Sequence, residues 1–194
     1  SFILNASDYG IPQNRRRFFL IGINKKFFDQ DIKLDFTDYM SKSYTIGEAI
    51  KDLEEVPVTT NIADSPTKYK NLSIPKQNDY LKRIANSNLI YNHLVTETSE
   101  IVLKRFKNLK PGQNFHDLPV ELKSTYSNSG RTQNTIYQRL DYNSVSGTVV
   151  NVRKSMWVHP TLDRSISVRE AARLQSFPDS FVFYGTKDSQ YQQV

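Results

Sequence analysis

Cysteine is absent from all 194 residues of the sequence. Its absence excludes disulfide bonds, zinc sites built on cysteine, and a thiolate nucleophile within these residues. Histidine is scarce too. The three histidines, His93, His116 and His159, are scattered along the sequence and lack the spacing of metal ligands. The sequence therefore predicts neither a metal site nor thiol chemistry in this chain.

Long hydrophobic runs are also missing. The apolar stretches at 18–23 and 181–183 are far too short to span a bilayer, and the N-terminal residues do not resemble a signal peptide. Lys and Arg number 26 against 20 Asp and Glu, which gives a formal net charge of +6. This balance favours a polyanionic partner, nucleic acid before membrane, for a globular protein.

The most distinctive stretch that is present runs from Tyr9 to Arg17 and leads into the apolar segment 18–23. Its Gly-Ile-Pro turn brings consecutive arginines to the start of an expected strand. Alternation along an extended chain sends Arg15 and Arg17 to one face and Arg16 to the other. Two neighbouring guanidinium groups can clamp a phosphate or a carbonyl edge. Composition alone, however, favours a solvated basic turn before a buried strand.

Elsewhere, periodicity and turn residues predict only short elements. Thr45 and Ser167 are each followed three positions later by glutamate, which is the spacing of a capping box. Residues 56–80 are rich in Asn, Thr, Ser, Pro and Lys without clear periodicity, so we expect a domain boundary there. These signals predict buried strands over 2–4 and 18–23, a strand over 145–152, and helices that begin after Thr45, near Asp79, near Ser99 and after Ser167.

A second distinctive stretch runs from His159 to Phe181 and includes Arg-Glu-Ala-Ala-Arg-Leu-Gln-Ser-Phe-Pro-Asp. Alone, it is explained by a capped helix with a basic face, ended by Pro178. Together with the segment 8–17 and with Arg139-Leu140-Asp141 ahead of Thr148, it resembles the C-terminal half of DNA (cytosine-5) methyltransferases. The segment 8–17 resembles the eighth conserved motif of that family, and 139–149 resembles the ninth. Val145-Ser146-Gly147 departs from the proline-rich turn of many members.

The resemblance implies an α/β fold in two parts. Residues 1–55 would contribute terminal strands and a helix of a doubly wound, Rossmann-like catalytic domain. Residues 56–180 would form a smaller α+β target-recognition domain, and 181–194 would return toward the catalytic domain. The family's Pro-Cys loop, its glycine-rich cofactor loop and its Gly-Asn motif are not in this sequence. We therefore expect a fragment that is inactive alone and whose exposed strand edges allow pairing as a dimer.

The resemblance also implies the site residues. Arg15 and Arg17 match arginines that line the catalytic pocket and support the missing cysteine. Double-stranded DNA is the implied partner, in a prokaryotic cytoplasm, and S-adenosylmethionine is the implied cofactor, bound mostly by residues outside this chain. The segment 127–138 is the candidate recognition loop, although a solvent-exposed polar loop is the simpler alternative. The residues expected to contact DNA are Gln13, Arg131, Gln133, Asn134, Arg139 and Thr148.

The expected contacts differ in kind. Arg131, Gln133 and Asn134 can recognise guanine and adenine edges in the major groove. Arg139 and Thr148, by their motif positions, are expected to fix the loop and contact backbone phosphate. Two alternatives remain open: a small subunit of a split methyltransferase, and a non-enzymatic DNA-binding module with a degenerate methyltransferase fold.

Overall fold

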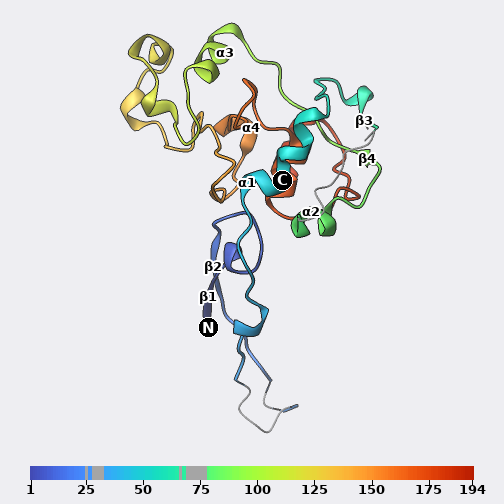
Figure 1. Cartoon of the computed structure of the whole chain (residues 1–194). Helices are drawn as coiled ribbons and strands as arrows, with labels where there is room; N and C mark the ends of the chain where they lie inside the picture. The colour runs from blue at the N-terminus through green and yellow to red at the C-terminus, as the bar shows by residue number, and fades with distance from the viewer. Residues whose placement is uncertain (25, 28–32, 66, 69–77) are drawn as a thin grey trace.

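The computed structural model describes residues 1–24, 26–27, 33–65, 67–68 and 78–194 (Figure 1). In this part the fold is mixed α/β, and its strands form two antiparallel pairs, β1 with β2 and β3 with β4. Short 3-10 turns join many of the elements. The strands are β1 (Phe2–Asn5), β2 (Arg16–Phe19), β3 (Thr67–Lys68) and β4 (Leu89–Ile90), and the helices are α1 (Ile46–Ile50), α2 (Asp79–Ile84), α3 (Glu100–Lys107), α4 (Val152–Ser155), α5 (Val168–Leu174) and α6 (Lys187–Gln193).

Strands β1 and β2 belong to an arm, here residues 1–5 and 16–40 as far as they are described, that projects from the body (Figure 1). Phe2 pairs with Phe19 in this hairpin. The prediction that these strands are buried is wrong, because β2 is exposed along its length and Phe18 retains 65% of its accessible surface. In the described residues, neither a third strand nor a helix pairs with the hairpin to bury its apolar side chains.

The capping predictions for the helices are confirmed. The Thr45 hydroxyl accepts the Glu48 N–H at the start of α1, and the Glu48 carboxylate accepts the Thr45 N–H. Ser167 and Glu170 form the same reciprocal pair at the start of α5. Helices α2 and α3 begin where expected. No helix in the described residues is long and apolar enough to cross a membrane.

The predicted strand over 145–152 is wrong. This segment forms a single bridge, between Gln13 and Ser146, and helix α4 begins at its end. Two of its valines, Val149 and Val152, pack in the main core instead, while Val150 is exposed. Helix α6 was not predicted, because its polar sequence has no apolar stripe.

The main core crosses the boundary expected near residue 56. Helix α1 packs against α5, so residues from both sides of that boundary share one apolar cluster. The division into 1–55, 56–180 and 181–194 stays a prediction, and the packing of the core does not follow it. A second cluster lies under α3, and we call this part the α3 lobe; its buried members are Phe106, Leu109, Phe115, Leu118, Tyr137 and Val158.

Candidate nucleic-acid interface

The turn that leads into β2 is held in one shape by short-range contacts. The Asn5 side-chain oxygen accepts the Arg15 N–H at 2.9 Å, and the Ala6 N–H donates to the Arg15 carbonyl at 3.0 Å. Gly10 has a φ of +76°, and a Cβ there would lie 2.6 Å from the Ser41 hydroxyl oxygen. The positive φ favours glycine, and a side chain at this position would also displace the Ser41 hydroxyl. The turn thus has little freedom to reorient the arginines that follow it.

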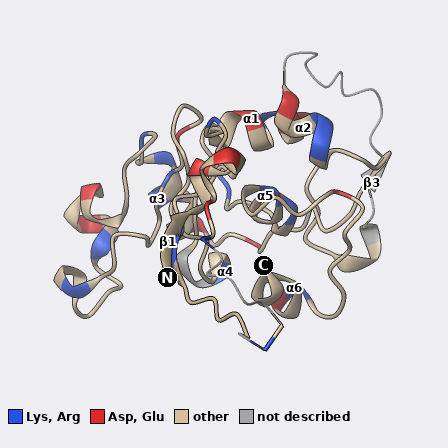
Figure 2. Cartoon of the chain, turned by 90° about the horizontal axis from the view of Figure 1, so that it is seen from below, with Lys and Arg blue, Asp and Glu red and all other residues tan. Residues whose placement is uncertain are grey.

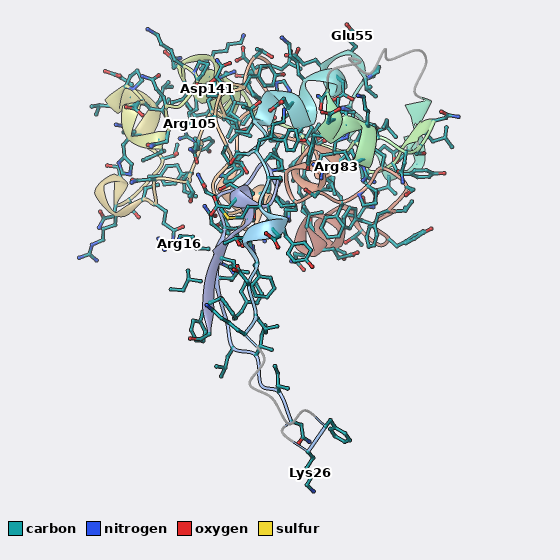
Figure 3. All side chains as sticks on the ribbon, turned by 60° about the horizontal axis from the view of Figure 1, so that its bottom comes forward. Arg16, Lys26, Glu55, Arg83, Arg105 and Asp141 are labelled. Atoms are coloured by element: carbon teal, nitrogen blue, oxygen red, sulfur yellow. The ribbon has the colours of Figure 1, made fainter. Side chains whose placement is uncertain are left out.

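Arg15 and Arg17 lie on the same face of the chain. Both line one shallow pocket, together with Leu4, Asn5, Ala6, Tyr9 and Phe19. Arg16 is not part of this pocket and lies beside the strand where the arm meets the body (Figure 3). The alternation predicted from the sequence is therefore confirmed for these side chains. Arg17 is exposed and Arg15 is half-buried, and a guanidinium pair beside a tyrosine and a phenylalanine can bind a planar or anionic group.

The arginine turn is bonded to a segment far along the chain. The Ser146 N–H and hydroxyl donate to the Pro12 carbonyl, at 3.1 and 2.7 Å, and the Asn14 N–H donates to the Ser146 carbonyl at 2.7 Å. The Thr148 hydroxyl donates to the Asn14 carbonyl at 3.0 Å. Ser146 was not predicted as a site residue. Its only signal in the sequence was that residues 145–147 differ from the proline-rich turn of many family members. These bonds join the two segments that resemble the eighth and ninth motifs.

Gln13 lies at this junction and is buried. It keeps 1% of its accessible surface, and its side-chain nitrogen has no hydrogen-bond partner among the described residues. The bridge to Ser146 holds it between the two segments. This burial disagrees with a direct contact between Gln13 and DNA in the present conformation.

Arg139 is also inside the protein. It is 4% exposed, and its guanidinium donates to the Phe106 carbonyl at 2.7 Å, to the His159 carbonyl at 3.0 Å and to Asp163 at 2.5 Å. These acceptors occupy the two Nη groups of Arg139 that would otherwise bind phosphate. The expected phosphate contact therefore does not fit this position. The other expectation, that Arg139 fixes the neighbouring loops, agrees with these bonds.

Arg131, Gln133 and Asn134 are exposed on the α3 lobe. They are not brought next to the arginine turn, because the lobe and the arm are separate parts of the molecule (Figure 1). Basic and acidic residues are interspersed along the described ribbon of the lobe and the body (Figure 2). Recognition of nucleic acid here would depend on individual side chains more than on bulk charge.

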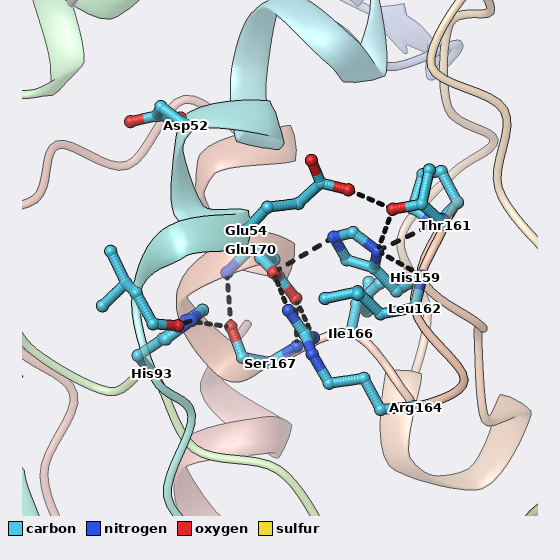
Figure 4. Close-up of polar contacts among 12 residues, drawn as sticks. Asp52, Glu54, His93, His159, Thr161, Leu162, Arg164, Ile166, Ser167 and Glu170 are labelled. Carbon is cyan, nitrogen blue, oxygen red and sulfur yellow. Dashed lines mark hydrogen bonds and ion pairs between the residues drawn. The ribbon is translucent and has the colours of Figure 1, made fainter. Parts of the chain in front are cut away.

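A buried polar network joins α5 to the 159–164 segment (Figure 4). Arg164 donates two bonds to the Glu170 carboxylate, at 2.6 and 2.8 Å. Burial alone would raise the pKa of Glu170, but the charge and bonds of Arg164 lower it to about 2. His93 bonds the Ser167 hydroxyl at 2.9 Å from the other side. No set of three or more potential metal ligands gathers in the described part of the chain.

His159 occupies the centre of this network in its neutral form. Its Nδ1 accepts the Leu162 N–H at 3.2 Å and the Thr161 N–H at 3.3 Å, so it has no room for a proton. Its Nε2 lies 3.6 Å from the Glu170 carboxylate. Burial lowers the pKa of His159 to about 4, against the opposing effect of Glu170. We infer a structural role for this histidine.

Acid is expected to destabilise the protein through His159. The unfolded chain takes up a proton near pH 6.5 and the folded chain only near pH 4, so stability falls as the pH falls through that window. The loss is about 3 kcal/mol in the free energy of unfolding. Urea titrations at pH 7, 5.5 and 4.5 measure it. The variant His159→Asn, which keeps an acceptor but cannot titrate, should show a flatter dependence; an unchanged slope would contradict this assignment.

Comparisons with known proteins indicate the family to which the chain belongs. A family model described as C-5 cytosine-specific DNA methylase matches residues 1–194. The type II methyltransferase M.DdeI of Desulfomicrobium norvegicum is 30% identical over 220 residues, which cover 99% of this chain and 49% of the relative. The type II methyltransferase M1.HphI of Haemophilus parahaemolyticus is 32% identical over 193 residues, which cover 99% of this chain and 42% of the relative.

The fold agrees with a solved structure. A prophage-encoded E. coli protein, described as a DNA modification methyltransferase, superposes with a TM-score of 0.71 at 26% identity, covering 98% of this chain and 53% of that one. The chain thus spans about half the length of the relatives that it matches. Since the family model matches residues 1–194 and the fold agrees, the chain belongs to the C-5 cytosine-specific DNA methylase family.

Proposed function

We propose that this chain supplies the DNA-facing half of a DNA (cytosine-5) methyltransferase. Such an enzyme transfers a methyl group from S-adenosylmethionine to C5 of a cytosine flipped out of the duplex. The observation that carries the proposal is the junction of the two motif segments, at which Ser146 and Thr148 bond the arginine turn. This junction holds Arg15 and Arg17 on one pocket face.

The arginine pair is proposed to hold the flipped base. Chemistry at C5 and C6 has to approach the ring face, which stacking covers inside a duplex, so the base must leave the stack. Flipping costs a few kcal/mol, roughly, and contacts to the base and its phosphates must offset that cost. Two guanidinium groups can satisfy a carbonyl edge or a phosphate with paired hydrogen bonds.

The reacting groups are proposed to come from another part of the enzyme. This chain has no cysteine to attack C6. In its described residues, no strand leads through a glycine-rich turn into a helix, the arrangement that cradles an adenosyl cofactor. The residues present therefore do not fit S-adenosylmethionine, and we assign the cofactor to the other part.

The exposed arm is the proposed contact with that other part. Phe18 is 65% exposed, Leu20 79% and Ile3 63%, and the edges of the hairpin are unpaired in the described residues. An apolar strand pair of this kind is stabilised when further strands continue its sheet. The hairpin would make the same contact if the other part were a separate subunit, as in a split methyltransferase. A second copy of this chain would occupy the same edge as a dimer.

Sequence recognition is proposed to lie on the α3 lobe. Arg131, Gln133 and Asn134 are exposed there and have the side chains that recognise guanine and adenine edges. Thr148, whose hydroxyl donates to the Asn14 carbonyl at the motif junction, is proposed to contact backbone phosphate. Gln13 and Arg139 are assigned to support of the junction and the loops.

The proposal is tested by methylation in cells. The complete reading frame that contains these residues is expressed in E. coli without its own cytosine-5 methyltransferase, and the DNA is sequenced after bisulfite treatment. Methylated cytosines are expected at one recurring sequence. The 194-residue chain alone should leave the DNA unmethylated, because it lacks the thiolate. Unmethylated DNA from the complete frame, with the protein present and folded, would favour the non-enzymatic DNA-binding alternative.

A further inference from the structure

Helix α3 carries a buried arginine without a carboxylate partner. Arg105 is 3% exposed, and no acidic side chain pairs with it among the described residues. Its neighbours Lys104 and Lys107 are exposed, while the Arg105 side chain is buried in the α3 lobe. A buried charge is costly unless hydrogen bonds compensate it. The hydrogen bonds of Arg105 therefore indicate what it holds in place.

Those bonds reach both ends of the candidate recognition loop. Before the loop, Arg105 Nε donates to the Leu122 carbonyl at 2.8 Å, and one Nη donates to the Thr125 hydroxyl. Near the C-terminal end of the loop, the other Nη donates to the Tyr137 hydroxyl at 3.0 Å. The guanidinium also lies over the rings of Tyr126 and Tyr137, 5.2 and 5.3 Å from their centroids. A single side chain thus fastens the two stems of the segment 127–136.

The second stem is held in a conformation that needs such support. Tyr137 has a φ of +53°, in the left-handed region that bulky residues rarely adopt, and it is 2% exposed. A residue in this region is strained and persists only where its surroundings hold it. Stacking on Phe115, with centroids 6.1 Å apart, and the bond to Arg105 provide this hold.

The part of the loop that carries Gln133 and Asn134 has further hydrogen bonds to the body of the α3 lobe, besides those that Arg105 makes. The Phe115 N–H donates to the Ile136 carbonyl at 3.0 Å, and His116 Nε2 bonds the Thr132 carbonyl at 2.8 Å. Contacts to base edges need side chains placed within about 0.5 Å of their productive geometry. An anchored stem provides that precision on a segment that is otherwise a surface loop.

We infer that Arg105 is a positioning residue for sequence recognition. It fixes the stems of the segment 127–136, so that Gln133 and Asn134 meet base edges in a constant orientation. This inference rests on the proposed function. It predicts that loss of the hydrogen bonds of Arg105, which we call the Arg105 clamp, lowers the selectivity for the DNA target sequence more than it weakens the affinity for DNA. A phosphate-contacting residue would have the opposite effect, since phosphate contacts carry no sequence information.

The test uses the assembled methyltransferase with Arg105→Lys, which keeps the charge but lacks the fork needed for three acceptors. The ratio of methylation rates at the cognate site and at sites with one altered base pair is expected to fall about tenfold. Tyr137→Phe and Thr125→Val each remove one bond while keeping the side-chain shape, and each should lower the ratio about threefold. Lys107→Met, an exposed change on the same helix, should leave the ratio unchanged.

The outcomes separate the inference from the proposed function. An unchanged ratio in all three clamp variants overturns the inference, even when thermal stability falls and methylation slows equally at every site. If Arg105→Lys does not fold, the two shape-preserving variants decide. If the unaltered enzyme methylates DNA without preference for a sequence, the proposed recognition role of the lobe fails. If it methylates no DNA, the proposed function itself fails.

Discussion

Replacing Arg15 and Arg17 by alanine is expected to slow methyl transfer by the assembled methyltransferase about 10²–10³-fold. Both side chains line one pocket, and the turn that presents them is held by Asn5 and by the bonds to Ser146. Removal of one preorganised donor from a reacting group costs about 10²–10³ in kcat in other enzymes. The loss should appear in the single-turnover rate, with a smaller change in the affinity for duplex DNA.

Arg16→Ala is the matched control for this pair. Arg16 is exposed and lies outside the pocket, on the opposite side of the same strand. Its loss removes one positive charge from the same turn, as each single substitution of the pair does, so it should weaken DNA binding modestly and leave the single-turnover rate near that of the unaltered enzyme. Equal losses for Arg16 and for the pair would mean that the turn contributes charge only, and would contradict the proposed grip on the base.

Replacing Arg173 by methionine is expected to lower the free energy of unfolding by about 3–5 kcal/mol. Arg173 is fully buried, donates to both Asp179 oxygens at 2.9 and 2.7 Å, and meets Asp52 at 2.6 Å. Burial alone would lower the pKa of Arg173, but the bonds to Asp179 and Asp52 raise it above its usual value. Methionine would leave these carboxylates with no countercharge from Arg173, and Asp179 is itself fully buried.

Urea unfolding of Arg173→Met and of Arg153→Met measures this effect. Arg153 also pairs with a carboxylate, Asp188 at 2.5 Å, but both partners are about half exposed. Exposed pairs contribute about 0–1 kcal/mol, so the control should unfold almost like the unaltered chain. A loss below 1 kcal/mol for Arg173→Met would show that the buried cluster is dispensable for stability.

The role of Arg173 was not evident from the sequence. The stretch 167–178 predicts a capped helix with a basic face, and the cap is confirmed. The basic face is not on the surface, because Arg169 and Arg173 are both fully buried. Arg169 bonds main-chain carbonyls at Tyr91, Pro178 and Phe181, so the helix holds the C-terminal segment in place. Partners from distant segments turn an expected solvated face into part of the core.

Local interactions explain which sequence-based predictions are confirmed. The capping boxes at Thr45 and Ser167 join residues three positions apart, and the alternation of Arg15 and Arg17 follows from an extended backbone. Such bonds form within one turn or one strand, whatever lies around them. The family resemblance adds to these, since it depends on ordered motifs that the chain carries in its primary structure.

Burial and partner choice depended on segments that meet across long sequence distances. Arg139 and Gln13 were expected at a DNA surface and are enclosed, while the apolar segment 18–23, expected inside, is exposed. The clamp of Arg105 on the loop stems likewise exists only because α3 packs against Tyr137. A residue's own chemistry says which bonds it can make. Whether water, a distant carbonyl or another polypeptide satisfies them depends on the packing of the folded chain.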